Sequence, residues 1–194
     1  MSKLKDHNFY FIHIPKNAGT SFEKQFCSSH NGHHRITEFP KEIWNKTIAI
    51  VRNPYTRLIS IYNYAKLNKS YWHSNDGSTR YPLHTLYNYC NTNSFEQFIK
   101  DICIFNKFTD VIHLKPQYFW IMTPENKIVT QVAKIENVDN DLSKILGDKI
   151  KLNKINTSKT QSYDDYYTEE LFKLVYDKYK KDFEMFGYQI NKLN

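Results

Sequence analysis

The chain has 194 residues, and its 40% hydrophobic and 16% aromatic content excludes a disordered polypeptide and suits one folded domain over residues 1–194. Lysine and arginine outnumber aspartate and glutamate by 27 to 20, so the formal net charge of +7 suggests an anionic partner. Nucleic acid, a phosphorylated cofactor and an acidic glycan all fit that charge, and so does a lysine-rich surface exposed to solvent.

The first predicted elements are a strand, a loop and a helix. Residues 9–14 are apolar and aromatic, which predicts a strand, and a helical pattern begins near Ser21. Between them, a loop at a helix N-terminus presents backbone N–H groups and the positive end of the helix dipole, which suit a phosphate or sulfate. Gly19 would permit close backbone approach to such a group. An ordinary strand–helix turn fits the same pattern, and the Walker A order is absent.

A second strand and helix follow. Residues 47–51 are apolar at every position, as in a parallel strand buried on both faces. Asn53 is a favourable N-cap, and Pro54 is a favourable first residue for the next helix. Arg52 stands at the end of the strand, where α/β folds bind ligands, and its guanidinium suits a phosphate. Ser60 lies two turns into the helix.

The rest of the chain continues this alternation. Residues 66–93 lack a clear period and are predicted to form a long loop. A capping box at residues 94–97 predicts the start of an amphipathic helix, and residues 128–135 are predicted to form one or two strands. Further helices are predicted over residues 138–146 and 168–183. The sequence therefore predicts a single-domain α/β fold, with a P-loop-like central parallel sheet flanked by helices.

The cysteines and the apolar segments bear on metal binding and on cellular location. Cys27, Cys90 and Cys103 match neither a disulfide framework nor a zinc pattern, and we expect no metal. No apolar run approaches the ~18 residues of a membrane span, and the polar first residues do not resemble a signal peptide. We therefore expect a cytoplasmic location, although a truncated luminal domain would look the same.

The two loops together resemble the phosphate-binding motifs of the carbohydrate sulfotransferases that use 3′-phosphoadenosine 5′-phosphosulfate (PAPS). HIPKNAGTS at residues 13–21 is similar to their 5′-phosphosulfate loop, usually written HIPKTAGTS, and VRNPYTRLISIY at residues 51–62 is similar to their 3′-phosphate motif, VRNPYDRLVSAY. Weaker similarities follow at residues 113–117, 134–137, 154–158 and 179–188. The resemblance covers nearly the whole chain, and the group contains heparan sulfate 2-O-sulfotransferase and the chondroitin sulfotransferases.

The resemblance implies roles for the matching residues. Lys16 would stabilise the charge that develops on the bridging oxygen, and Arg52 and Ser60 would hold the 3′-phosphate. PAPS would be the cofactor and 3′-phosphoadenosine 5′-phosphate (PAP) its product. The chain departs from the family at Asn17, where threonine is more usual, so that side-chain contact is in doubt while the backbone cradle is not. The 5′-phosphosulfate would be held by Pro15, Lys16, Asn17, Ala18, Gly19, Thr20 and Ser21.

Transfer to a hydroxyl needs a base, and two adjacent histidines are candidates. In the resembling enzymes a histidine precedes an acidic residue by five positions; His33 with Glu38 keeps that spacing and His34 does not, so we favour His33. Adjacent histidines in a polar loop can equally be solvated side chains. Glu23 is another candidate base, although a glutamate in the first turn of a helix is more often a partner of the helix dipole.

Four residues are predicted to contact the acceptor substrate. His113 and Gln117 would line it, or else serve ordinary packing. Trp72 and Arg80 lie in a loop that mixes aromatic and cationic side chains, which suit a sugar ring and its acidic groups, although a plain surface loop is equally consistent. The predicted partner is a glycan or another hydroxyl-bearing small molecule, with no nucleic acid.

Other functions fit the sequence less well. A P-loop nucleotide kinase would need a Walker A lysine followed by serine or threonine and a magnesium-binding carboxylate, and neither is present. A basic protein that binds nucleic acid or other anions would cluster its cations on one element, whereas here they are spread through the chain. A degenerate fold used only for binding would not need to keep Lys16, Arg52 and Ser60. The sequence therefore predicts in-line sulfuryl transfer with a histidine base.

Overall fold

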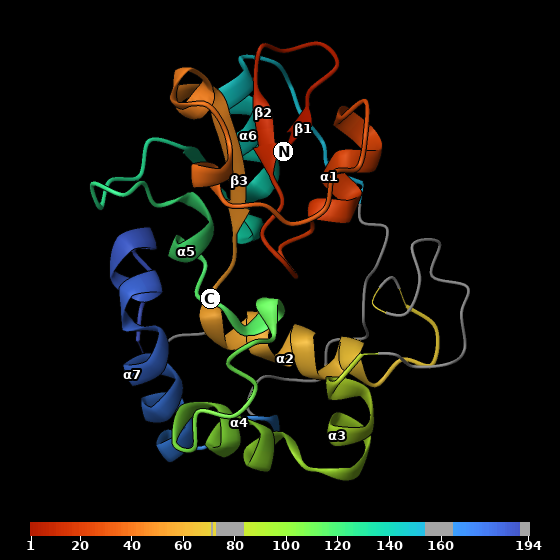
Figure 1. Ribbon diagram of the computed structural model, residues 1–194, viewed down its shortest axis with the longest axis vertical. Coiled ribbons are helices and arrows are strands. Elements are labelled where there is room, and N and C mark those ends of the chain that lie inside the picture. The colour runs from red at the N-terminus through yellow and green to blue at the C-terminus, as the bar shows by residue number, and fades with distance from the viewer. Residues whose placement is uncertain (71, 73–83, 154–164, 191–194) are drawn as a thin grey trace.

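The computed structural model describes residues 1–70, 72, 84–153 and 165–190 (Figure 1). A sheet of four strands lies in the upper half of the view, with α1 and α6 beside it, and α2, α3, α4 and α7 form the lower half. The first strand is antiparallel to the second, and the other neighbours are parallel. The predicted α/β fold is confirmed. The strands, in spatial order, are β1 (Ser2–Lys3), β2 (Tyr10–Ile12), β3 (Thr47–Val51) and β4 (Gln131–Lys134).

Helices and short 3-10 segments connect these strands. The α-helices are α1 (Gly19–Phe26), α2 (Pro54–Ala65), α3 (Leu86–Thr92), α4 (Phe95–Cys103), α5 (Tyr118–Ile121), α6 (Val138–Leu146) and α7 (Glu169–Phe186). The 3-10 segments are η1 (Ile36–Glu38), η2 (Lys41–Lys46), η3 (Ile112–Leu114) and η4 (Ile135–Asn137).

Side-chain and glycine caps set several helix ends where the sequence predicts them. Asn53 Oδ1 accepts a hydrogen bond from Tyr55 N at 2.9 Å and caps α2. Ser94 Oγ accepts from Gln97 N at 3.1 Å and caps α4. Gly147, with φ of 80°, ends α6 in the left-handed conformation that glycine adopts without steric cost.

β3 is an inner strand of the sheet, and all of its residues are buried. Ile48 and Ile50 pack with residues of α1 and α6 on one face, whereas Ala49 and Val51 pack with α5 on the other. Ile12 of β2 lies beside Ala49 in a parallel register. The carboxyl ends of β2 and β3 therefore point to the same edge of the sheet, and the loops that follow them meet there.

The segment after α2 differs from its prediction. The sequence predicts a loop throughout residues 66–93, but α3 occupies the end of that range. Leu86 and Cys90, one turn apart, are its buried residues, and a stripe of two apolar side chains is too short to show a helical period. At the other end of the chain, α7 continues to Phe186, beyond the predicted end, through a non-helical φ at Tyr179.

Arg57 is a buried cation that fastens α2 to two other segments. It is 1% exposed, and its guanidinium donates to the carbonyls of Pro15 at 3.1 Å, Lys115 at 3.0 Å and His113 at 2.9 Å. Asp182, buried on α7, supplies the opposite charge. Arg57 therefore holds the loop after β2 and the segment around η3 in fixed positions relative to α2.

We expect Arg57→Met to lower the free energy of unfolding by about 3 kcal/mol or more, because it leaves three backbone carbonyls without their donor and a buried carboxylate without its counter-charge. Urea unfolding followed by circular dichroism measures the change. Lys173→Met is the control, since Lys173 and Asp177 form an exposed pair on α7 and its loss should cost less than about 0.5 kcal/mol. A loss below about 1 kcal/mol for Arg57→Met would contradict the role given to it.

Candidate active site

The loop between β2 and α1 has an unusual backbone. Lys16 and Ala18 are left-handed, with φ of 66° and 61°. Such a conformation costs a non-glycine residue about 1–3 kcal/mol and is found most often where a loop serves a binding site. α1 has no side-chain cap, and its first helical bond runs from Phe22 N to Ala18 O at 3.1 Å. The N–H groups before Phe22 thus have no acceptor within the helix, as an anion site requires.

Gly19 is required by a neighbouring imidazole. A Cβ at Gly19 would lie 2.1 Å from Cδ2 and 2.3 Å from Nε2 of His13, so the ring occupies the space that a side chain would need. The sequence predicts that Gly19 lets the backbone approach a phosphate closely. In the structure, the close approach that glycine permits is that of His13.

Lys16 extends from this loop towards two aromatic rings. Its Nζ lies 3.2 Å from the centre of the Tyr64 ring and 5.7 Å from that of Trp72. Burial, and then the charge of Arg52, lower the pKa of Lys16 to about 7. The ammonium group is therefore partly deprotonated near neutral pH, and a bound anion would favour its charged form. Tyr64 was not predicted from the sequence; the signal that could have found it is its position four residues after Ser60, on the same helix face.

Arg52 begins the second loop, directly after β3. Its Nε donates to Thr56 Oγ1 at 2.9 Å, and its backbone N–H donates to Gln117 Oε1 at 2.8 Å. Ser60 is partly exposed on α2. Because Arg52 contributes to the lowered pKa of Lys16, the cations of the two predicted phosphate motifs lie within electrostatic range of one another.

Gln117 joins the two loops. It is 0% exposed; its Oε1 accepts from Asn17 Nδ2 at 2.7 Å and from Arg52 N, and its Nε2 donates to Arg52 O at 2.8 Å. Its backbone N–H donates to Asp182 at 2.7 Å. Gln117 thus holds the loops together, and the acceptor contact predicted for it does not fit a buried, fully bonded amide. Asn17 also points inward and donates to Ile50 O at 2.9 Å, which leaves its backbone as the part that can face a cofactor.

Except for residues 154–158, which lie outside the described residues, the weaker sequence similarities contribute structural ties around the same loops. Glu136 Oε1 accepts from Asn53 N at 2.8 Å, and its Oε2 accepts from Tyr188 OH at 3.0 Å. Tyr179 OH donates to Leu114 O at 2.9 Å. The C-terminal helix and the residues after it therefore brace the loop that carries Arg52.

His33 lies inside the site, and His34 is at the surface. His33 Nδ1 donates to the backbone oxygen of His13 at 2.7 Å, and its ring is edge-on to those of His13 and His113, with centroids 4.4 Å and 5.7 Å away. Burial, and then the charge of His13, lower the pKa of His33 to about 4, so its ring is neutral near pH 7 with Nε2 unprotonated. His34 is exposed, and it is His34, not His33, that bonds to Glu38, at 2.8 Å.

Trp72 and His113 lie next to each other, and the His113 ring contacts that of His33. Trp72 has its ring centroid 4.2 Å from those of both His113 and His84, and His84 Nε2 is 3.4 Å from His113 Nδ1. Burial first, and then the charges of His33 and His84, lower the pKa of His113 to about 2. His84 was not predicted from the sequence, because it lies in no recognisable motif. Arg80 lies outside the described residues.

A model of the sulfotransferase family matches residues 4–189, which is nearly the whole chain. The chain belongs to the sulfotransferase family. No curated protein and no solved structure is significantly similar to it. Family membership supports sulfuryl transfer as the reaction. The candidate active site of this sulfotransferase is the edge of the sheet where the loops after β2 and β3 meet.

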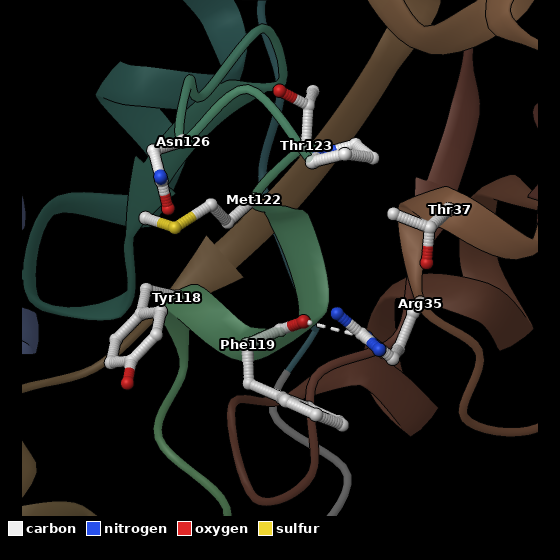
Figure 2. A pocket seen from close by; sticks show the side chains of 8 residues that line it. Arg35, Thr37, Tyr118, Phe119, Met122, Thr123 and Asn126 are labelled. Atoms are coloured by element: carbon white, nitrogen blue, oxygen red, sulfur yellow. Dashed lines mark hydrogen bonds between the residues drawn. The ribbon is translucent and has the colours of Figure 1, made fainter.

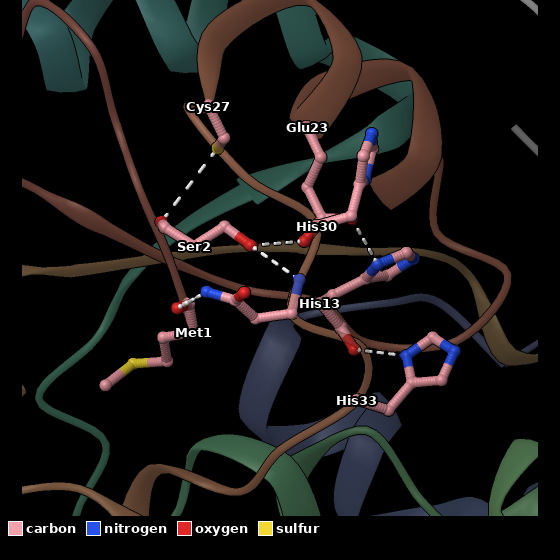
Figure 3. Close-up of polar contacts among 8 residues, drawn as sticks. Met1, Ser2, His13, Glu23, Cys27, His30 and His33 are labelled. Atoms are coloured by element: carbon pink, nitrogen blue, oxygen red, sulfur yellow. Dashed lines mark hydrogen bonds and ion pairs between the residues drawn. The ribbon is translucent and has the colours of Figure 1, made fainter. Parts of the chain in front are cut away.

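Glu23 of the sulfotransferase is held in hydrogen bonds rather than left free as a base (Figure 3). Its Oε1 accepts from Ser2 Oγ at 2.7 Å, and its Oε2 bonds to the Nδ1 atoms of His13 at 2.8 Å and His30 at 3.0 Å. Burial alone would raise the pKa of Glu23, but the hydrogen bonds from His13, Ser2 and His30 outweigh it and lower the pKa to about 2. A carboxylate of so low a pKa is a poor general base at neutral pH.

A pocket of about 430 Å³ opens beside α5 of the sulfotransferase (Figure 2). Arg35 reaches across it, and its Nε donates to Phe119 O at 3.1 Å. None of the predicted site residues lines the pocket, so the candidate active site is defined by the two loops. The lining residues are Arg35, Thr37, Tyr118, Phe119, Met122, Thr123, Pro124 and Asn126.

The described part of the sulfotransferase contains neither a candidate metal site nor a helix that could span a membrane. Within residues 1–70, 72, 84–153 and 165–190, no group of three or more histidine, cysteine, aspartate or glutamate side chains could hold a metal ion. Within the same ranges, none of the helices combines the length and the apolar character needed to cross a bilayer.

We expect Gly19→Ala to destabilise the sulfotransferase by about 1–3 kcal/mol, because the new methyl group would overlap the His13 ring. His13→Ala removes that overlap, so adding Gly19→Ala to it should cost less than about 0.5 kcal/mol. Urea unfolding of the four proteins of this double-mutant cycle measures the coupling. Equal costs of Gly19→Ala in the two backgrounds would show that the His13 ring is not what Gly19 accommodates.

Proposed function

We propose that this sulfotransferase transfers the sulfuryl group of PAPS to a hydroxyl group of a carbohydrate. The observation that carries the proposal is that Lys16 and Arg52, from two separate loops, lie within electrostatic range of each other, and that Lys16 and the uncharged imidazole of His33 both lie within range of His113. Two cations and the start of a helix suit a ligand with separate anionic groups, and a neutral imidazole suits removal of a hydroxyl proton.

The residues fit PAPS, which has an anionic group at each end of its ribose. The start of α1 and Lys16 would hold the 5′-phosphosulfate, while Arg52 and the hydroxyl of Ser60 would hold the 3′-phosphate. When bound, PAPS supplies an activated sulfuryl group attached to a phosphate oxygen. Burial, and then the charge of Arg52, lower the pKa of Lys16 to about 7 in the protein alone, and a bound anionic group would favour the charged form of Lys16.

Lys16 would act on the leaving side of the reaction. The ring of Tyr64, 3.2 Å from Nζ, limits the positions that the ammonium group can take. Next to an anion, Lys16 holds its proton and stabilises negative charge that grows on the bridging oxygen. A preorganised charge of this kind acts mainly in the transition state and needs little rearrangement of the protein.

His33 would act on the acceptor side. Its Nδ1 keeps a proton because it donates to His13 O, so Nε2 is the nitrogen that can take the proton of the acceptor hydroxyl. The pKa of about 4 in the protein alone is low for a base, but bound anionic groups nearby would raise it towards neutrality. His33 and Lys16 would then serve opposite ends of an in-line transfer.

The side chains around His113 support a carbohydrate acceptor. Trp72 presents an aromatic ring, as sugar-binding sites often do, and His84 and His113 are imidazoles that can bond to hydroxyl groups. Burial keeps His113 uncharged, which suits hydrogen bonding to a neutral sugar hydroxyl. Arg80, in the same part of the sequence, remains a predicted contact.

The first test of this function is binding of the product nucleotide. We expect PAP to raise the thermal unfolding midpoint more than AMP does, because only PAP carries the 3′-phosphate that Arg52 and Ser60 would bind; a ligand at 100 times its Kd stabilises by about 2.7 kcal/mol. Arg52→Met should remove the difference between the two nucleotides, and Arg35→Met, in the separate pocket, should not. Equal shifts for PAP and AMP in the unmodified protein would contradict the 3′-phosphate site.

The second test is transfer from labelled PAPS to a panel of glycans. Lys16→Ala should lower turnover by roughly 10²–10³ while PAP affinity changes by less than about tenfold, since one preorganised charge is lost from the transition state. His33→Ala should lower turnover more than His34→Ala, because His34 is an exposed partner of Glu38. Near-normal turnover in Lys16→Ala would remove the proposed mechanism, and a larger effect at His34 would transfer the role of base to that residue.

A further inference from the structure

His13 contacts several parts of the candidate site at once (Figure 3). Its Nδ1 is 2.8 Å from Glu23 Oε2, and its ring fills the space beside Gly19. Its backbone oxygen accepts the bond from His33 Nδ1 at 2.7 Å, and the two imidazole rings meet edge-on with centroids 4.4 Å apart. A single residue thus connects a buried carboxylate, the start of α1 and the candidate base.

Glu23 can fix the orientation of His13. Its side chain is 2% exposed, and Ser2 occupies its Oε1, so Oε2 is the oxygen available to His13 and His30. An ionised carboxylate accepts hydrogen bonds only, so the bond to His13 requires a proton on Nδ1 of that ring. This bond sets the rotation of the imidazole, as carboxylate partners of histidines generally do.

We propose that the Glu23–His13 pair positions His33, holding its imidazole beside the loop after β2 with Nε2 directed away from the bond to His13. His13 and Glu23 are then positioning residues that act through His33 and not on the substrate. The purpose of this positioning rests on the function proposed above, in which His33 is the base. The positioning itself is a property of the resting protein and can be measured without any transfer reaction.

Charged and titratable groups act on His33 from the segments around it: His13 from the loop after β2, Glu23 from α1, Arg57 from α2 and His113 from η3. Burial, the charge of His13 and the charge of Arg57 lower the pKa of His33, whereas the His13 carbonyl and Glu23 raise it. Removing the His13 ring while keeping Glu23 takes away a lowering charge and part of the burial. Both changes raise the pKa of His33 towards the ordinary value.

His13→Asn is the informative variant, because the amide nitrogen can still donate to Glu23 while the ring that contacts His33 and Gly19 is lost. His30→Asn is the matched control: His30 bonds to the same carboxylate oxygen, but its side chain is 51% exposed. NMR titration of the imidazoles in the resting protein, with His33 assigned from a His33→Gln variant, should show the pKa of His33 rising by about one unit or more in His13→Asn. In His30→Asn it should move by less than about 0.3 units.

The consequence for activity is measured on the same variants. His13→Asn should lower kcat about tenfold or more, keep the Kd for PAP within about threefold, and move the acid limb of the kcat/KM profile to higher pH by the shift seen in the titration. An unchanged titration of His33, or a lower kcat with an unmoved acid limb, would overturn the proposal. If the unmodified protein transferred no sulfuryl group, the proposed function would be wrong. The titration would still show whether His13 and Glu23 position His33.

Glu23→Gln provides a second variant should His13→Asn not fold. It preserves side-chain volume but replaces the ionised partner of His13. In the unmodified protein, the bond to the Glu23 carboxylate holds His13 as the Nδ1–H tautomer, which ¹⁵N chemical shifts of the imidazole report. A glutamine amide can donate as well as accept, so Glu23→Gln should produce a mixture of the two tautomers of His13 and shift the pKa of His33. A single Nδ1–H tautomer of His13 with an unchanged pKa of His33 in Glu23→Gln would overturn the proposal.

Discussion

The amide of Gln117 binds Asn17 and Arg52 at the same time, and the geometry of the candidate site depends on this link. Parallel strands bring the loops after β2 and β3 to one edge of the sheet, but strand ends alone do not fix the distance between two loops. The buried amide does so with three hydrogen bonds at 2.7–2.8 Å. Asp182 then holds Gln117 by its backbone, so the constraint extends to α7.

The same link brings two positive charges together. Burial of Lys16, and then the charge of Arg52, lower the pKa of Lys16 to about 7. Keeping the buried Lys16 charged near another cation therefore costs free energy, and a bound anion would offset that cost. In the proposed function, anion affinity would depend on how rigidly the loops are held, as well as on which residues they carry.

The sequence predicted the elements whose signals are local. The apolar run of β3 and the caps at Asn53 and Ser94 each depend on neighbours within a few residues. The contacts that organise the site are not local: Gln117 and Asn17 are 100 residues apart, and no periodicity reports such a pair. His33 illustrates the difference, since spacing to Glu38 favoured it, whereas its place in the structure comes from His13.

Helix α2 couples the two halves of the proposed reaction. Arg57 bonds to Pro15 O, next to Lys16, and Tyr64 on the same helix lies against Lys16 Nζ. Ser60, one turn before Tyr64, is the predicted contact of the 3′-phosphate. A displacement of α2 would therefore move the 3′-phosphate contact and the ring beside Lys16 together. In the proposed function, recognition of the nucleotide and placement of the charge that assists sulfuryl transfer would consequently both depend on α2, so a cofactor that lacks the 3′-phosphate would lose orientation at the sulfuryl group as well as affinity.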